Sequence, residues 1–560
     1  MRMIIRQYVA SLKEENELDA LISNTLYANK VLPQTKTTKG ARQRGVDIEA
    51  IGSDENDDKR LYIITVKQGD LDRRMWDKDQ NAVRQSLDQI IETHLRLLTT
   101  KLKELPCTII VATNGEMKQT VDEDWKGYVE KNSSNKLDFQ FWGLNKIADM
   151  VDSTLITDTM LSKPELTLFR KTLALIEDNE YDLHHYYQLI SGLFDSTTKY
   201  THKNIIKLIR LCLLLQNIIF KWCQNIGNIK NAYIASERMI LIAGKFLIDK
   251  KFHVKKKIWR EFLTLLLSRQ NIGFEYVKKV TPQFSVPYRL GHYTNAIEYE
   301  YPIVCFEQLG IFAQIGLEHI FLFEGIDNDD YLRNAYSQRI KYINRSITNL
   351  ITNNPGAYFP QFDEHIIDIS LVLQFYYQTH DFYAGKWYLN LLTKRVINSY
   401  KYLNRFHPIF RTDFDELNLI WAKGKEPRTK SSHLILSLAE WNLVYGELEG
   451  YKFLSRCKMP DGIYRNINLQ LWIPDKKTEN YYYTHYGMNN SGTTIVNYEI
   501  PEDYMDLIKR IQEEHELFDD YDDFKVLSNL MFFPNLASRH YRKIQFPILW
   551  RIHLLKRASA

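Results

Sequence analysis

Two short runs decide the fold of the first part of this chain: GVDIEAI at residues 45–51 and LYIITVK at residues 61–67, separated by a turn containing the polar run SDENDDKR at 53–60. Alternating apolar and β-branched residues bounded by turn residues predict two paired strands. Successive side chains of a strand point to opposite faces, so Asp47 and Glu49 share one face, as do Thr65 and Lys67. In a twisted hairpin, both Thr65 and Lys67 can meet Asp47.

Helical patterns alternate with further strand patterns around this hairpin. We predict helices over 11–30, 79–103 and 144–151 and strands over 107–112 and 137–142, giving the order α-β-β-α-β-α-β-α. The first helix carries an apolar stripe of Leu18, Leu21, Ile22, Thr25 and Leu26. This alternation predicts an α/β domain over residues 1–155.

The remaining four hundred or so residues are predicted to be mostly α-helical. A chain of 560 residues is too long for one core, so we place helical domains at 156–355 and 356–560, divided at the turn signal Asn353-Asn354-Pro355-Gly356. The stretches 381–387 and 447–453 each follow one amphipathic helix and open another, as in an α-solenoid, although one weak pair does not make a repeat. Alternating runs at 466–473 and 493–500 predict a projecting β-hairpin arm near 463–500.

Composition excludes several classes of protein. The formal charge of +4 is too small to indicate nucleic-acid binding by itself, so any basic surface must be local. Five cysteines without a CxxC pair favour neither a disulfide framework nor a zinc site. The motifs of P-loop ATPases, Rossmann cofactor sites, α/β-hydrolases and HExxH zinc proteases are absent from the sequence.

Hydropathy gives an expectation for localisation. The two most apolar stretches, 205–223 and 304–325, are interrupted by charged residues, which a bilayer centre disfavours. The first residues become charged before any apolar segment of useful length, unlike a secretory signal. We expect a cytoplasmic protein that does not span a membrane.

The hairpin carries the most specific chemistry in the sequence. Asp47 and Lys67 lie on neighbouring strands, and metal-assisted phosphodiester cleavage uses such a pair. A carboxylate at a strand end can hold Mg²⁺, which lowers the pKa of a bound water and stabilises the charged transition state. A lysine can orient or deprotonate that water. In the simpler alternative, Lys67 is a strand-end lysine paired with an ordinary acid.

Residues 1–155 resemble the PD-(D/E)XK nuclease superfamily, and within it the Mrr-like restriction endonucleases found in bacterial anti-phage effectors. The resemblance rests on an acidic first helix, the Gly45-Val46-Asp47 strand, the strand ending in Lys67, a long helix, a strand, and the final unit FQFWGLNKIADMV at 139–151. It implies a restriction-endonuclease-like fold and DNA cleavage with Mg²⁺ or Mn²⁺. By position, it implies that Asp47 is a metal ligand, Lys67 the catalytic lysine, and Glu17, ahead of Glu14, an accessory ligand.

The sequence departs from the family pattern at Thr65, where the motif carries Asp, Glu or, in Mrr-like members, Gln. A threonine hydroxyl is a poor substitute for a charged ligand. Glu49 or Asp70 could supply the missing oxygen, and we favour Glu49 because it shares a face with Asp47. Otherwise the site is weakened or inactive.

Basic residues flank the predicted site on both sides. If the nuclease interpretation holds, they can neutralise the phosphates of an entering nucleic acid; for the first group a solvated loop is an equal alternative. They are Lys36, Lys39, Arg42 and Arg44 before the first strand and Arg73 and Arg74 after the second. Trp76, which stands among the second group, is predicted to pack rather than to stack on a base.

Two functions of different classes follow. The first is a Mg²⁺-dependent DNA endonuclease whose helical region senses a trigger, binds a partner protein of the same defence system, or forms a homo-oligomer; RNA is not excluded as substrate. The second is a non-catalytic scaffold with a degenerate nuclease fold, which binds nucleic acid or protein. Thr65 is the best evidence for the second.

Overall fold

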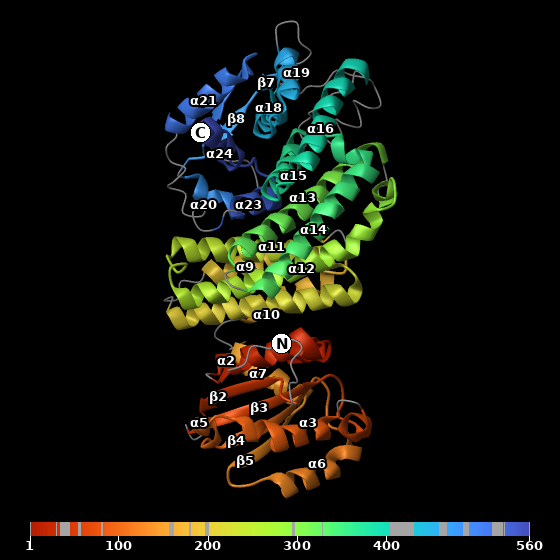
Figure 1. The fold of residues 1–560 in the computed structure, drawn as a ribbon, viewed down its shortest axis with the longest axis vertical. Coiled ribbons are helices and arrows are strands. Elements are labelled where there is room, and N and C mark those ends of the chain that lie inside the picture. The colour runs from red at the N-terminus through yellow and green to blue at the C-terminus, as the bar shows by residue number, and fades with distance from the viewer. Residues whose placement is uncertain are drawn as a thin grey trace. The chain divides into compact units, whose positions relative to one another are not determined.

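The computed structural model describes residues 2–29, 31–33, 45–53, 58–79, 82–155, 162–178, 181–195, 201–293, 297–326, 329–403, 431–458, 467–475, 477–484, 492–517, 530 and 532–558. The chain forms two compact units, Met1–Asn228 and Ile229–Ala560. The first contains a mixed sheet with helices, and the second is mostly helical (Figure 1). The coarse prediction of an α/β region followed by a large helical region is confirmed.

The sheet of the first unit has five strands in the order β1-β2-β3-β4-β5. They are β1 (Leu32–Pro33), β2 (Ile48–Ser53), β3 (Lys59–Lys67), β4 (Cys107–Thr113) and β5 (Leu137–Trp142). The pairs β1–β2 and β2–β3 are antiparallel, whereas β3–β4 and β4–β5 are parallel. Helices connect the parallel strands, because a parallel pair needs a crossover connection. The predicted hairpin and both later strands are therefore confirmed.

Helices surround this sheet along the first 155 residues. They are α1 (Arg2–Ala10), η1 (Glu14–Leu18), α2 (Asp19–Ala28), η2 (Arg74–Lys78), α3 (Val83–Gln89), η3 (Ile90–His94), α4 (Leu95–Leu97), α5 (Thr100–Lys103), α6 (Gln119–Asn132) and α7 (Leu144–Leu155). The helix predicted over 11–30 begins only at Glu14, with one π-helical turn, η1, before α2. The helix predicted over 79–103 is interrupted at Leu98, whose ψ of 149° leaves the helical region.

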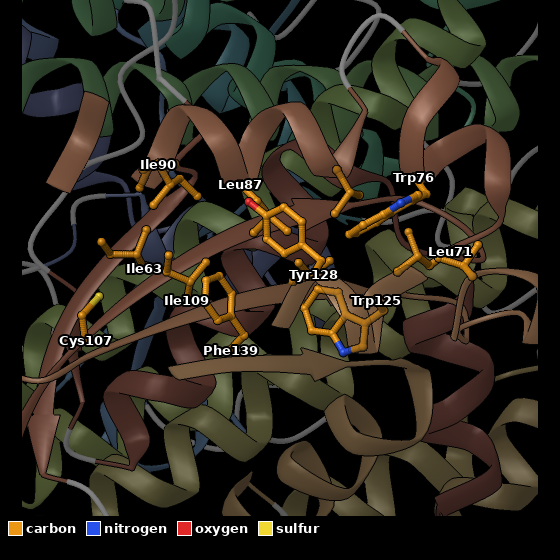
Figure 2. Packing of buried hydrophobic residues seen from close by; sticks show 14 of the residues in the cluster. Ile63, Leu71, Trp76, Leu87, Ile90, Cys107, Ile109, Trp125, Tyr128 and Phe139 are labelled. Carbon is orange, nitrogen blue, oxygen red and sulfur yellow. The ribbon is translucent and has the colours of Figure 1, made fainter. Parts of the chain in front are cut away.

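The core of this domain lies between one face of the sheet and helices α3 and α6 (Figure 2). Ile63 and Ile109 come from the strands, and Leu87 comes from α3. Trp76 is only 3% exposed and meets the rings of Trp125 and Tyr128 edge-on, at centroid distances of 6.1 and 5.6 Å. The prediction that Trp76 packs in the core is confirmed.

The first unit extends beyond the predicted boundary at residue 155. It also contains α8 (Lys163–Leu175), α9 (His184–Asp195) and α10 (His202–Ile226). Helix α10 packs against α1 and α7, and the Arg210 guanidinium lies 4.7 Å from the centre of the Tyr27 ring. The first compact unit of the structure therefore ends at Asn228, whereas the α/β domain was predicted to end at residue 155.

The second unit is built from helices with a few short strands. Its helices are α11 (Ile229–Asp249), α12 (Lys256–Phe284), η4 (Arg289–Tyr293), α13 (Ile297–Glu324), α14 (Asp330–Asn353), η5 (Pro355–Tyr358), η6 (Asp363–His365), α15 (Ile366–Gln378), α16 (Phe382–Leu403), α18 (Leu434–Tyr445), α19 (Leu448–Lys458), α20 (Thr478–Tyr482), α21 (Tyr504–Leu517), α23 (Phe533–Tyr541) and α24 (Ile548–Ala558). Helix α13 packs against both α14 and α15, on either side of the boundary predicted at 355. That boundary is a turn within one compact unit.

The predicted β-hairpin arm is present in a shorter form. Strand β8 (Leu471–Ile473) pairs antiparallel with β9 (Thr493–Ile495), and β6 (Ser431–Ser432) pairs with β7 (Asn468–Leu469). All of β8 is buried, and the Trp472 ring stacks on Tyr482 with centroids 6.0 Å apart. The expectation of a projecting arm is therefore wrong for β8, because its aromatic side chain packs into the unit. Residues 485–491 lie outside the described part of the chain.

One helical segment in the described residues, Glu300–Glu324, is long and apolar enough to cross a membrane by length and composition. Its most apolar window is 83% buried inside the protein. Packing of α13 against α14 and α15 accounts for its apolar character, as expected for the core helix of a helical unit.

Candidate active site

The site begins at the tight entry into strand β2. Gly45 has a φ of +78°, and a Cβ atom there would lie 2.4 Å from the backbone oxygen of Ser86. Only glycine fits this left-handed position beside α3. The Asp47 amide then donates to the carbonyl of Ile64 at 3.0 Å, which sets the start of the β2–β3 ladder.

The Asp47 carboxylate is fixed by the neighbouring strand. Its Oδ2 atom accepts a hydrogen bond from the Val66 amide at 2.7 Å and a longer one from the Thr65 hydroxyl at 3.4 Å. Thr65 is fully buried. The predicted meeting of Asp47 with Thr65 on one face of the hairpin is present in the structure.

Lys67 ends strand β3 and faces the π-helical turn η1. Its Nζ atom lies 3.4 Å from Oε1 of Glu14, and the side chains of Lys67 and Glu14 are 14% and 38% exposed. The Gln68 amide donates to Oε2 of the same glutamate at 3.3 Å. Both oxygens of Glu14 therefore lie against the residues at the end of β3.

Electrostatics connect these groups. The pKa of Asp47 is raised, and burial is the main cause. The hydrogen bond from the Val66 amide and the charge of Lys67 act to lower this pKa. The charge of Glu14 raises it and the Thr65 hydroxyl lowers it, both by smaller amounts. Two carboxylates and one ammonium group thus influence one another across the ends of β2, β3 and η1. Burial and the Glu14 charge both disfavour the ionised form of Asp47. A cation bound to both carboxylates would stabilise their ionised forms.

The donor set fits a hydrated divalent cation. Among the described residues, no group of three His, Cys, Asp or Glu side chains forms a closed metal site. Mg²⁺ does not require one, because it keeps several waters and is held by one or two carboxylates together with substrate phosphates. Asp47 and Glu14 can supply two carboxylates and Thr65 a hydroxyl oxygen.

Two of the predicted carboxylates have other partners. Glu49 lies opposite Ile63 in the register, on the face predicted for it, but its Oε2 atom is 2.9 Å from His94 Nε2. The structure places Glu14, and not the preferred Glu17, beside Lys67. Glu17 instead pairs with Lys221 of α10 at 3.0 Å, because the π-helical turn directs the two glutamates to different neighbours.

Asp70, the second candidate for the missing oxygen, also binds other partners. Its Oδ2 atom lies 2.7 Å from Lys118 Nζ, and its Oδ1 atom accepts from the Glu116 amide at 2.9 Å. The hydrogen bond from Lys118 is the main reason that the pKa of Asp70 is lowered.

The predicted nucleic-acid contacts are only partly described. Lys36, Lys39, Arg42 and Arg44 lie outside the described residues. Arg73 pairs with Asp124 at 3.6 Å and Arg74 with Asp79 at 2.8 Å, and their side chains are 67% and 78% exposed. Exposed pairs of this kind contribute little to stability, so both arginines can exchange their partners for phosphates at small cost.

Sequence reasoning missed Asn114, which joins three segments of the site. Its side-chain oxygen accepts from the Gly69 amide at 2.6 Å, and its amide donates to the carbonyls of Ala10 and Leu12 at 3.2 and 2.7 Å. This buried side chain thus ties the segment after Lys67 to the segment before Glu14. The available signal was its position: parallel strands β3 and β4 end at the same edge of the sheet, and Asn114 directly follows β4.

Comparison with known proteins gives no relatives: no family model, no curated protein and no solved structure matches the chain. The function is therefore inferred from the residues of the site and their contacts.

Proposed function

We propose that the first unit is a metal-dependent nuclease that cleaves DNA phosphodiester bonds. The observation that carries this proposal is the convergence of Asp47, Lys67 and Glu14 at one end of a mixed sheet. A partly buried carboxylate fixed by a strand amide, a lysine and a second carboxylate are the groups that phosphodiester hydrolysis needs. The resemblance to PD-(D/E)XK nucleases is consistent with this set and its strand order.

Each residue has a distinct task in the proposed reaction. Asp47 and Glu14 would hold Mg²⁺ or Mn²⁺, which when bound supplies an acidified water and neutralises phosphate charge. The Val66 amide and the Thr65 hydroxyl keep the Asp47 carboxylate in one orientation. Lys67 donates hydrogen bonds to the attacking water or to a phosphate oxygen, and its pairing with Glu14 holds the ammonium group in place.

The substrate and setting belong to the same proposal. Arg73 and Arg74 are exposed and can bind the backbone of a nucleic acid near the site. The second unit is larger than cleavage chemistry requires, so we assign it to control: sensing a trigger, binding a partner protein, or homo-oligomerisation. By analogy with the resembling family, the setting is bacterial anti-phage defence.

One observation favours the scaffold as second candidate. Thr65 replaces the acidic or amide side chain of the nuclease pattern, and Glu49 is paired with His94 instead of completing the site. A scaffold would keep the fold and lack metal binding. A ligand that binds the folded state raises the melting temperature, so Mg²⁺ or Mn²⁺ stabilises the nuclease and has no such effect on the scaffold.

The test is cleavage by the purified chain. Supercoiled plasmid, linear duplex, single-stranded DNA and RNA are each incubated with Mg²⁺ or Mn²⁺, and with EDTA as a control. Metal-dependent nicking of DNA is the expected result. Absence of cleavage together with absence of a metal-induced melting shift would favour the scaffold.

A further inference from the structure

Helix α10 presents one buried lysine to the first residues of the chain. Lys221 is 8% exposed and lies on a largely apolar helix, in which Ile218, Ile219 and Cys223 are also buried. Its Nζ atom donates to Oε2 of Glu17 at 3.0 Å. A buried ammonium group is costly unless it is paired, and the carboxylate that pairs with Lys221 is that of Glu17, whose side chain is 28% exposed. The Lys221–Glu17 contact therefore constrains Glu17.

Glu17 belongs to the same short turn as the glutamate of the candidate site. The π-helical turn η1 contains only five residues, Glu14–Leu18. Oε2 of Glu17 also accepts from the Lys13 amide at 2.8 Å, which closes the turn on itself. One end of η1 is thus held by α10 through Lys221, while Glu14 at the other end meets Lys67 and the Gln68 amide.

We infer that Lys221 is a positioning residue for the proposed nuclease: through Glu17 it holds the η1 turn so that Glu14 stays beside Lys67. This inference rests on the proposed function. It gives the helical part of the first unit a direct means of altering the chemistry, because a shift of α10 moves a carboxylate of the site. A displacement of about 1 Å in a catalytic group can lower a rate by about 100-fold.

The experiment compares Lys221→Met, Lys221→Arg and the control Lys203→Met in the full chain. Lys203 is an exposed lysine in the first turn of the same helix. We expect Lys221→Met to lower the kcat of metal-dependent plasmid cleavage by about 10- to 100-fold with little change in KM. Lys221→Arg restores most of the rate because it keeps the charge, and Lys203→Met behaves as the unchanged chain.

Hydrogen exchange provides a readout that does not depend on cleavage. In Lys221→Met, amides of residues 14–18 are expected to exchange faster, while those of β4 stay protected. Glu17→Gln, which keeps a hydrogen-bond acceptor, serves as a milder variant if Lys221→Met fails to fold. It is expected to produce the same two changes at smaller size.

The outcomes separate this inference from the proposed function. Unchanged exchange over 14–18 together with unchanged kcat in Lys221→Met overturns the positioning role. A rise in KM alone also overturns it, since that would place Lys221 in substrate binding. Faster exchange over 14–18, in a chain whose unaltered form neither cleaves DNA nor gains melting temperature with Mg²⁺ or Mn²⁺, supports the link between α10 and η1 and overturns the nuclease proposal.

Discussion

At the scale of single residues, Glu14 and Glu17 show what the sequence could and could not predict. The family resemblance implied that one of them is an accessory ligand and ranked Glu17 before Glu14, whereas the structure places Glu14 beside Lys67 and pairs Glu17 with Lys221. Helical periodicity left the choice between the two open, and η1 is π-helical, so the spacing of an ordinary α-helix does not hold through this turn. Asp47, Thr65 and Lys67 were predicted together because strand periodicity is simple and the hairpin register is regular.

Glu14 gives the first test at this scale. We expect Glu14→Gln to lower the cleavage rate by about 100-fold or more, since the amide is a weaker cation ligand and a weaker partner for Lys67. The matched control is Glu15→Gln, an exposed residue of the same turn, which should leave the rate unchanged. Steady-state cleavage of plasmid at fixed Mg²⁺ measures both. Equal effects of the two substitutions would remove Glu14 from the site.

Thr65 gives a prediction about pH. The pKa of Asp47 is raised by burial, and the Thr65 hydroxyl acts in the opposite direction. Metal binding needs Asp47 ionised, so the acid limb of the pH dependence of Mg²⁺ affinity, measured by adding Mg²⁺ to the metal-free chain, should lie above the ordinary aspartate value of 3.8. Thr65→Val removes the hydroxyl with little change of shape and should move that limb to higher pH. An acid limb at the same pH in Thr65→Val would show that the Thr65 hydroxyl does not stabilise the ionised form of Asp47.

At the scale of elements, the strands and the apolar stripe of the first helix were predicted well, and the helix interruptions were not. All five stripe residues are buried: Leu18, Leu21, Ile22, Thr25 and Leu26. The π-helical turns and the break at Leu98 carry no glycine or proline, so the local sequence gives no signal for them. Asn114 went unassigned for a related reason, because its three hydrogen bonds join segments about a hundred and about forty-five residues away in sequence.

A glycine-to-alanine substitution tests the backbone geometry at the entry to strand β2, and a second one within α6 serves as a comparison. Gly45→Ala should destabilise the first unit by at least about 1–2 kcal/mol, because alanine disfavours a left-handed φ and its Cβ would collide with Ser86. Gly127 lies within α6, and a Cβ there would meet nothing within 4 Å. Gly127→Ala should therefore stabilise the unit by about 0.5–1 kcal/mol through its higher helix propensity. Chemical denaturation measures both, and an undiminished stability of Gly45→Ala would contradict the close packing at the entry.

At the scale of the whole molecule, the sequence predicted the change from α/β to helical character, and the compact first unit extends beyond the residue at which that change occurs. Residue 155 is where strand patterns stop. The compact unit continues to Asn228, because α10 packs on α1 and α7 and supplies Lys221 to Glu17. Composition along the chain reports secondary structure, whereas the extent of a unit is decided by contacts between distant segments.

Fragments test this boundary. A fragment of residues 1–228 should unfold in one cooperative transition and show the same first-unit stability as the full chain. A fragment of residues 1–155 lacks α10, so α1 and α7 lose a packing partner and Glu17 loses its ion pair. Its melting temperature should be lower by several degrees, as expected for a loss of a few kcal/mol. Equal melting temperatures would show that residues 156–228 do not belong to this folding unit.

The most direct test of the central claim is the rate of metal-dependent plasmid cleavage by the unaltered chain, Asp47→Asn, Lys67→Met and the control Asp70→Asn. In Asp47→Asn the side-chain amide oxygen can still accept from the Val66 amide, so the fold is kept while the charge is lost. Asp70 sits beyond the same strand but is held by Lys118. We predict cleavage by the unaltered chain and by Asp70→Asn, and a loss of at least about 100-fold in the other two. Undiminished cleavage by Asp47→Asn and Lys67→Met would contradict the site.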